Sequence, residues 1–163
     1  MSTEVLSALN EVKREDVRDY IMDIQDRMAE VPGMIKGDNP VCPLKHTFVN
    51  GIYTREIFIP KGMMIVGKIH KHAHPNFLMS GDVSVLTEEG ARRIQGPKAL
   101  VSPAGTKRLL YTHEATVWVT VHANPDNKDD LEPLEDEIIA KTYEEFDALP
   151  KHEFFKCITN KES

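Results

Sequence analysis

The chain has 163 residues, of which 40% are hydrophobic and 28% are charged, and its formal net charge is −6; this length suits one ordinary domain with short extensions. No apolar run approaches the roughly 18 residues that a membrane-spanning helix needs, and the acidic N-terminal segment fits neither a signal nor a transit peptide. Two cysteines, Cys42 and Cys157, cannot form a disulfide framework, which favours a reduced, cytoplasmic protein.

The first thirty residues are predicted to form a helix that ends at Pro32-Gly33. A connector without hydrophobic periodicity follows, with the sequence GMIKGDNPVCP over residues 33–43. Apolar residues recur in the helix at a period of 3.6, so they form one stripe along a single face. The residues of this stripe are Val17, Tyr20, Ile21, Ile24 and Met28.

Short β-type runs separated by turn signals occupy the middle of the chain. Asn50-Gly51 is a hairpin signal between HTFV and IYTREIFI, and seven or eight such runs follow one another as far as His122. Regularly spaced short strands are typical of a β-sandwich or a small barrel. We therefore expect a helix and connector over 1–44, a β-barrel over 45–124, and helices with a tail over 125–163.

The helical pattern returns after Asn124-Pro125. Thr142 to Glu145 resembles a capping box that opens a short last helix. In the tail, Phe154 and Phe155 are expected to dock on the body of the domain. The apolar face of the longer helix is predicted to consist of Leu131, Leu134, Ile138 and Ile139.

Charge is divided unevenly along the chain. Residues 45–122 carry a net charge of +5, and the remaining segments carry −11. Six of the seven histidines also lie in this basic middle. A basic, histidine-rich centre between acidic ends is where we expect a site for an anion, although solvent-facing lysines and arginines would give the same pattern.

Three histidines alternate in the run MMIVGKIHKHAHPNF. If residues 64–74 are one extended strand, Lys68, His70, His72 and His74 share one face. Neutral imidazole is a favoured ligand for Zn, Fe, Ni or Mn, and alternate positions of a strand readily reach one ion. His70 and His72 are the expected pair of metal ligands, with His74 at the mouth of the site. A solvent-facing cluster that binds metal adventitiously is the alternative.

These residues, followed by a Gly-Asp turn, a Pro-x-Gly turn and a late strand with a histidine, resemble the cupin family of small jelly-roll barrels. The first cupin motif contains HxH and a glutamate. His70 and His72 match the HxH, but Asn76 stands at the glutamate position and the gap to the next glycine is two residues short. A second register places His74 at the glutamate position, His70 at the second histidine and Lys68 at the first.

The second cupin motif is matched at its turn but differs at the position of its metal-binding residue. Gly96 and the Pro-Ala-Gly turn at 103–105 fit with one extra spacer residue, but Arg108 stands where the resemblance implies a metal-binding histidine. This departure replaces a ligand with a permanent cation. His113 or His122 is expected to complete the metal site, because a barrel brings neighbouring strands together.

A broader resemblance involves small, functionally uncharacterised cupin-type proteins of tailed phages. The matching stretches are CPLKHTF, REIFIPKG, IHKHAHPNFLMSGDVSVLTEEG, SPAGTKR and TVWVTVH. This likeness spans most of the chain and implies a protein that works in the cytoplasm of an infected bacterium. It implies no particular activity.

Several further residues are candidates for binding an anion. The guanidinium of Arg108 suits phosphate or carboxylate, Lys68 lies on the histidine face, and Arg55 is a further cation in the strand IYTREIFI. Tyr111 and Trp118 are predicted to stack on a base or an aromatic ring, or else to belong to the core. No phosphate-binding glycine loop is present in the sequence.

We thus expect a mainly β, cupin-like jelly-roll barrel flanked by N-terminal and C-terminal helices. The leading hypothesis is binding of a small anionic ligand, such as a nucleotide-type signal, in the barrel, with a His-bound divalent metal assisting. A metal-dependent enzyme acting on a phosphorylated or carboxylated substrate is one alternative, and a structural or virion accessory protein is another. We expect a homodimer, and neither nucleic acid nor a membrane as partner.

Overall fold

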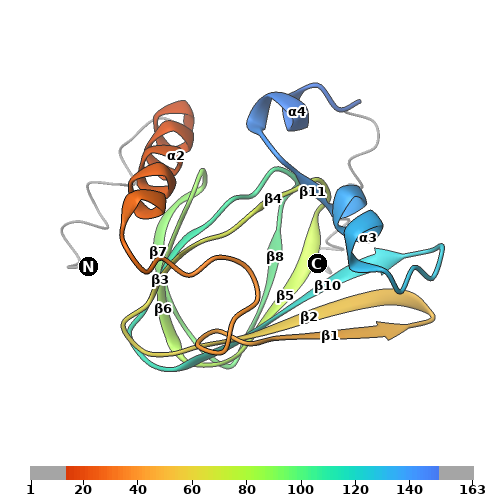
Figure 1. Cartoon of the computed structure of the whole chain (residues 1–163), viewed down its shortest axis with the longest axis horizontal. Coiled ribbons are helices and arrows are strands. Elements are labelled where there is room, and N and C mark those ends of the chain that lie inside the picture. The colour runs from red at the N-terminus through yellow and green to blue at the C-terminus, as the bar shows by residue number, and fades with distance from the viewer. Residues whose placement is uncertain (1–13, 151–163) are drawn as a thin grey trace, which may run out of the picture.

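The middle of the chain folds into two facing antiparallel sheets that enclose a barrel (Figure 1). The computed structural model describes residues 14–150. The five-stranded sheet contains, in spatial order, β1 (Leu44–Val49), β2 (Gly51–Ile59), β10 (Thr116–Asn124), β5 (His74–Ser80) and β8 (Lys98–Ser102). The four-stranded sheet contains β3 (Met64–Val66), β9 (Leu109–Thr112), β6 (Asp82–Thr87) and β7 (Gly90–Gln95). A two-stranded pair joins β4 (Ile69–His70) to β11 (Ile139–Ala140).

The strand order is that of a jelly roll. The late strand β10 lies between β2 and β5, and the late strand β9 lies between β3 and β6. Each sheet therefore mixes strands from distant parts of the chain, which a simple meander does not do. This arrangement confirms the expected mainly β, jelly-roll fold with flanking helices.

Period-2 alternation determines which side chains fill the barrel. The inward-facing residues of both sheets form one apolar core, which includes Ile59 on β2, Leu78 on β5, Val83 and Val85 on β6, and Trp118 on β10. The hairpin predicted at Asn50-Gly51 is confirmed, because β1 and β2 pair across it and Gly51 has a φ of +77°.

Among residues 14–150, three helices pack against the outside of the barrel (Figure 1). Helix α2 (Arg14–Glu30) covers the four-stranded sheet, where Val17 and Ile21 contact Leu86 and Leu109. Helix α3 (Leu131–Ile138) buries its apolar face against Tyr53. Helix α4 (Tyr143–Asp147) packs against β4 and β11 through its two buried aromatic side chains.

The predicted capping box is present with one difference. The Thr142 hydroxyl accepts a hydrogen bond from the Glu145 backbone N–H at 3.1 Å, as expected for an N-cap. The Glu145 carboxylate, however, accepts a hydrogen bond from the backbone N–H of Lys141, one residue before the cap. Both bonds satisfy backbone donors where the short helix begins.

The expectation of one extended strand over 64–74 is wrong. The chain leaves strand geometry at Gly67-Lys68 and bends again at 71–73, so it divides into β3, β4 and the start of β5. Pairing explains the break, because β3 pairs with β9, β4 pairs with β11 and β5 joins the other sheet. Histidines that alternate in sequence therefore do not all share one face.

The predictions for residues 1–13 and for the tail, including Phe154, Phe155 and Cys157, lie outside the described residues. None of the helices in the described part of the chain combines the length and apolar character that crossing a bilayer demands.

Candidate functional site

The register of β2, β10 and β5 arranges the barrel interior in rows. Antiparallel pairing aligns inward-facing residues across the three strands, and the chemistry of the rows changes along the barrel. Imidazoles and a phenol form the row next to α3, a cation and two polar groups form the middle row, and apolar groups form the third. These rows are Tyr53, His122 and His74; Arg55, Thr120 and Asn76; and Ile57, Trp118 and Leu78.

Three buried histidines meet at the first row. His74 and His122 come from neighbouring strands of the five-stranded sheet, and His70 reaches them from β4. One ring nitrogen of each lies within 4.8 Å of the others. Ring centroids are 4.3 Å apart for His70 and His74, 4.7 Å for His74 and His122, and 5.4 Å for His70 and His122. We call this group the histidine trio.

The Pro-Ala-Gly turn fixes the position of His70. The backbone N–H of Gly105 donates to the His70 carbonyl at 2.7 Å, and the His70 N–H donates to the Thr106 carbonyl at 3.3 Å. Gly105 has a φ of +81°, and a Cβ there would lie 2.5 Å from the Phe146 ring. Only glycine therefore fits this turn and keeps α4 in contact with it.

The histidine trio is uncharged at neutral pH. Burial is the main cause and the nearby Arg108 adds repulsion, so that the pKa of His74 falls to about 4, that of His122 falls to about 3, and that of His70 lies well below its ordinary value. Neutral imidazoles present lone pairs, which a metal ion requires.

Two nitrogens of the trio fit a metal ion better than they fit a plain core. The Nδ1 atom of His70 and the Nε2 atom of His74 are buried and have no hydrogen-bond partner. Buried polar atoms in proteins are usually satisfied, so two imidazole nitrogens without a partner in one cluster require an explanation. Three neutral nitrogen donors suit Zn, Fe, Ni or Mn. The residues present thus fit a divalent transition metal.

Arg108 lies inside the barrel beside the middle row, where polar side chains hold its guanidinium. Its guanidinium donates to the Asn76 Oδ1 atom at 2.8 Å and to the Ser102 hydroxyl, and it lies 5.2 Å from the centroid of the Trp118 ring. The Trp118 indole N–H also donates to Asn76 Oδ1, at 3.2 Å. Burial, with a smaller contribution from the Arg92 charge, lowers the pKa of Arg108 to about 10. It remains a cation at neutral pH.

Arg55 provides a second cation from the middle row. Burial is the main factor that lowers its pKa, while Tyr53 and Asp38 oppose the shift. Within residues 14–150, no carboxylate forms an ion pair with either Arg55 or Arg108. By contrast, Lys68 is paired with Glu135 of α3. The barrel therefore holds two guanidinium groups that form no ion pair with a described carboxylate, although the more distant Asp38 acts on Arg55.

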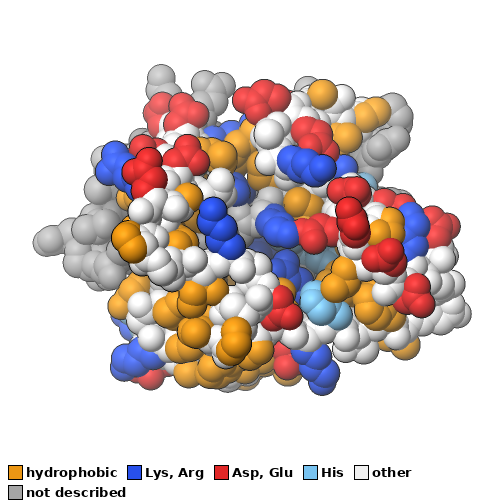
Figure 2. Space-filling model, viewed as in Figure 1, with side chains coloured by type: hydrophobic (Ala, Val, Ile, Leu, Met, Phe, Trp, Pro, Cys, Tyr) orange, Lys and Arg blue, Asp and Glu red, His pale blue; other side chains and the backbone are white. Residues whose placement is uncertain are grey.

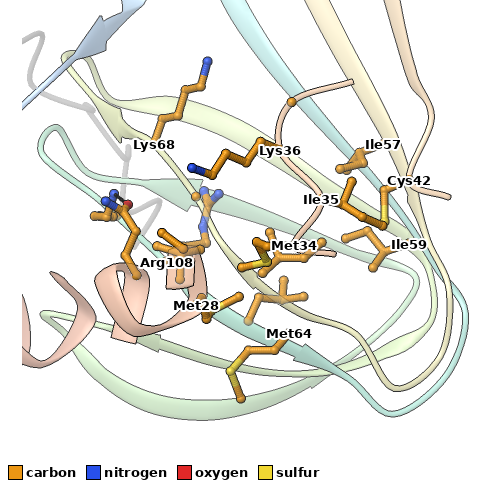
Figure 3. A pocket seen from close by; sticks show the side chains of 18 of the residues that line it. Met28, Met34, Ile35, Lys36, Cys42, Ile57, Ile59, Met64, Lys68 and Arg108 are labelled. Atoms are coloured by element: carbon orange, nitrogen blue, oxygen red, sulfur yellow. Dashed lines mark hydrogen bonds between the residues drawn. The ribbon is translucent and has the colours of Figure 1, made fainter. Parts of the chain in front are cut away.

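A cavity of about 940 Å³ connects the guanidinium groups of Arg55 and Arg108 to the surface. Its volume suits a small organic ligand. Arg55, Lys68, His70, Arg108 and Trp118 all line it. Figure 2 shows basic side chains gathered in a hollow at the centre of this face, with acidic side chains over α2 and α3 around it. Figure 3 shows Lys36, Lys68 and Arg108 on one side of the cavity.

Other residues that the sequence suggested lie elsewhere. His72 is exposed on the bend between β4 and β5, outside the trio. Tyr111 packs edge-on against His113, whose Nε2 atom lies 2.7 Å from the Ser84 hydroxyl on the outer face of β6. None of the three suggested residues, His72, Tyr111 and His113, lines the cavity.

Cys42 and His46, whose spacing of four residues would allow a thiol–imidazole pair, do not form one. Cys42 is buried in the apolar core, where burial raises the pKa of its thiol, and His46 instead bonds the Tyr53 hydroxyl at 2.8 Å.

Sequence reasoning missed the residues that support Arg108. Asn76 and Ser102 form one polar network with it, and Thr120 lies between Arg55 and Asn76 in the middle row. One signal existed for Asn76, since it occupies a position where the cupin motif has a glutamate. Nothing in the sequence pattern marked Ser102 or Thr120.

Comparisons with known proteins give distant matches. No protein-family model and no curated protein sequence match the chain. Among solved structures, KdgF from Halomonas sp. is 15% identical, with a TM-score of 0.46 over 54% of this chain and 84% of that one. A cupin superfamily protein from Desulfitobacterium hafniense is 6% identical, with a TM-score of 0.46 over 55% and 84%. Ectoine synthase from P. lautus is 14% identical, with a TM-score of 0.45 over 60% and 75%.

Proposed function

We propose that this chain is a cupin-type barrel that binds a small anionic ligand through Arg55 and Arg108, beside a divalent metal held by His70, His74 and His122. The observation that carries the proposal is that two guanidinium groups without an ion-pair partner among the described residues line one cavity.

The energetics of burial favour an anion as the partner of these arginines. Taking a cation out of water is costly unless an opposite charge or hydrogen-bond acceptors compensate it. Asn76 and Ser102 supply acceptors for one edge of the Arg108 guanidinium, and this fixes its orientation in advance. Carboxylate and phosphate match the planar fork that remains.

The metal part of the proposal rests on the histidine trio. Its three buried imidazoles are neutral, two of them have an unpartnered nitrogen, and all three approach one another. A bound divalent metal would supply a Lewis acid and a point of attachment for an oxyanion. The rings of Tyr53 and His122 stack with their centroids 5.9 Å apart, and this contact restrains the orientation of His122.

Metal content tests the trio directly. Tag-free protein purified without immobilised metal should contain near-stoichiometric metal by mass spectrometry. His74→Ala should lose this metal, whereas His72→Ala, which removes an exposed histidine outside the trio, should retain it. Metal at background level in the wild type would contradict this part of the proposal.

Calorimetry with inorganic phosphate tests the anion site separately. Arg108→Gln and Arg55→Gln should each weaken phosphate binding at least tenfold, because each removes a charged donor from the cavity. Lys98→Gln is the matched control, since it removes an exposed cation of β8 that does not line the cavity. Equal affinities in all four proteins would contradict the assignment.

A homodimer is also part of the proposal. The outward-facing side of the five-stranded sheet exposes several large apolar side chains, which favours a second copy of the chain as its cover. Sedimentation velocity should show a dimer, and Phe77→Glu should shift it toward monomer. The exposed residues of this face are Ile52, Phe58, Phe77 and Val101.

The resemblance to phage proteins remains the only support for three finer predictions. These are an origin in a tailed phage, a location in the bacterial cytoplasm, and a nucleotide-type signal as the ligand. Detecting the protein in the cytoplasmic fraction of infected cells, and absent from purified particles, would support the first two. Calorimetry with AMP would test the third.

A further inference from the structure

The cavity has two chemically different ends. Along β2 the inward-facing residue changes from Arg55 to Ile57 and then to Ile59, and all three line the cavity. Successive inward positions on a strand are about 7 Å apart, so the apolar wall extends roughly 7–13 Å from the Arg55 position. A bare phosphate or acetate would reach only the cationic end.

Residues from outside the barrel complete the apolar end. The end of α2 and the connector after it cross the opening of the barrel and contribute Met28, Met34 and Ile35 to the lining (Figures 1 and 3). Met63 and Met64 contribute from the edge of the other sheet. Four of the seven methionines of the chain thus line this one cavity.

The exposure of these side chains indicates a surface built for a ligand rather than a closed core. Ile35 and Met64 are 38% and 46% exposed although they line the cavity. Methionine is flexible and polarizable, so a methionine-rich wall adapts to apolar groups of different shape. Figure 3 shows Ile35, Ile57 and Ile59 on the side away from Lys68 and Arg108.

We propose that the ligand is an amphipathic anion, with one carboxylate or phosphate head at Arg55 and Arg108 and an apolar chain against Ile57, Ile59 and the methionines. This inference rests on the proposed function, because it assumes that the two arginines bind the head. It adds that most of the affinity comes from the apolar chain. The ligand class is therefore an acyl carboxylate or an alkyl phosphate.

Calorimetry with the series acetate, butyrate, hexanoate and octanoate tests the inference, with octyl phosphate as the second head group. Each added methylene should increase affinity roughly fourfold, since burying one contributes about 0.8 kcal/mol. Met64→Gln should weaken octanoate binding several-fold and leave phosphate binding unchanged. Met79→Gln is the matched control, because Met79 is similarly exposed, at 55%, on the outer face of β5.

The possible outcomes separate the two proposals. Acetate and octanoate binding equally well, or AMP binding more tightly than octanoate, would overturn the amphipathic ligand and leave the anion site standing. Octanol binding as tightly as octanoate would overturn the role of the head group. If none of the anions binds, or if Arg108→Gln leaves all affinities unchanged, the proposed function fails together with this inference.

Discussion

Acid should destabilise the metal-free protein steeply, because the folded state keeps buried imidazoles neutral. The pKa is about 4 for His74 and about 3 for His122, compared with an ordinary value of 6.5. Below pH 6.5 the unfolded chain therefore binds protons that the folded chain does not, and the free energy of unfolding falls as the pH falls. The stability that the neutral rings confer is complete above this range.

The magnitude follows from the two shifts. Between about pH 8 and pH 5, each of the two histidines should remove about 2 kcal/mol from the free energy of unfolding. Their combined effect of about 4 kcal/mol is a large share of the roughly 5–15 kcal/mol that stabilises a typical domain. Added metal should oppose the loss, because it binds only the neutral rings of the folded state.

Urea unfolding in EDTA, followed by the fluorescence of the single tryptophan, measures this dependence at several pH values. His122→Gln should remove about 2 kcal/mol of it, the share of one histidine, because glutamine does not titrate, while His70 and His74 still contribute. His72→Asn is the matched control and should leave the dependence in place. A wild-type stability that is flat from pH 8 to pH 5, or an unchanged slope in His122→Gln, would refute the reasoning.

Two further predictions concern stability. Gly105→Ala should lower the free energy of unfolding by about 3 kcal/mol, measured by heat or urea, because the φ of Gly105 is +81° and a Cβ would lie 2.5 Å from Phe146. Gly37→Ala should lower it by only about 1 kcal/mol, because Gly37 has a φ of +68° but nothing within 4 Å of an added Cβ. Equal losses would exclude the contact as the cause. Arg18→Gln should lower the free energy of unfolding by about 1–2 kcal/mol. It removes a stacking contact with Tyr143 and two ion pairs, one joining α2 to the barrel and one joining α2 to α4. A loss below about 0.5 kcal/mol would contradict this prediction.

Local patterns in the sequence were sufficient to predict a β-sandwich or small barrel flanked by helices, whereas the jelly roll was implied by the resemblance to cupins. The turn at Asn50-Gly51, the alternation of the strands and the capping residue Thr142 each act over a few residues, and the structure contains all three. The break in the strand predicted over 64–74 was not predictable in this way. It arises because β4 pairs with β11, about seventy residues further along the chain, and pairing over such a distance leaves no local signature.

The residue types of the site were predictable from the sequence, but the contacts between these residues were not. Alternation predicted that His70, His72 and His74 share one face, yet the bend at 71–73 exposes His72 and lets His74 meet His122 on the neighbouring strand. Arg108 was identified through its departure from the cupin motif. Its contacts with Asn76 depend on three-dimensional packing, which periodicity does not encode.

The arrangement of charges would make the proposed metal and the proposed anion dependent on each other. Arg55 and Arg108 both lower the pKa of His122, so the same two cations must also repel a divalent metal at the histidine trio. An anion bound to the arginines would cancel this repulsion and could supply an oxygen ligand to the metal. By linkage, the metal must then tighten the anion by the same factor. Substituting Arg108 by glutamine should therefore lower the affinity for the anion and raise the affinity for the metal in the absence of the anion. This opposite effect of one substitution distinguishes a shared site from two independent ones.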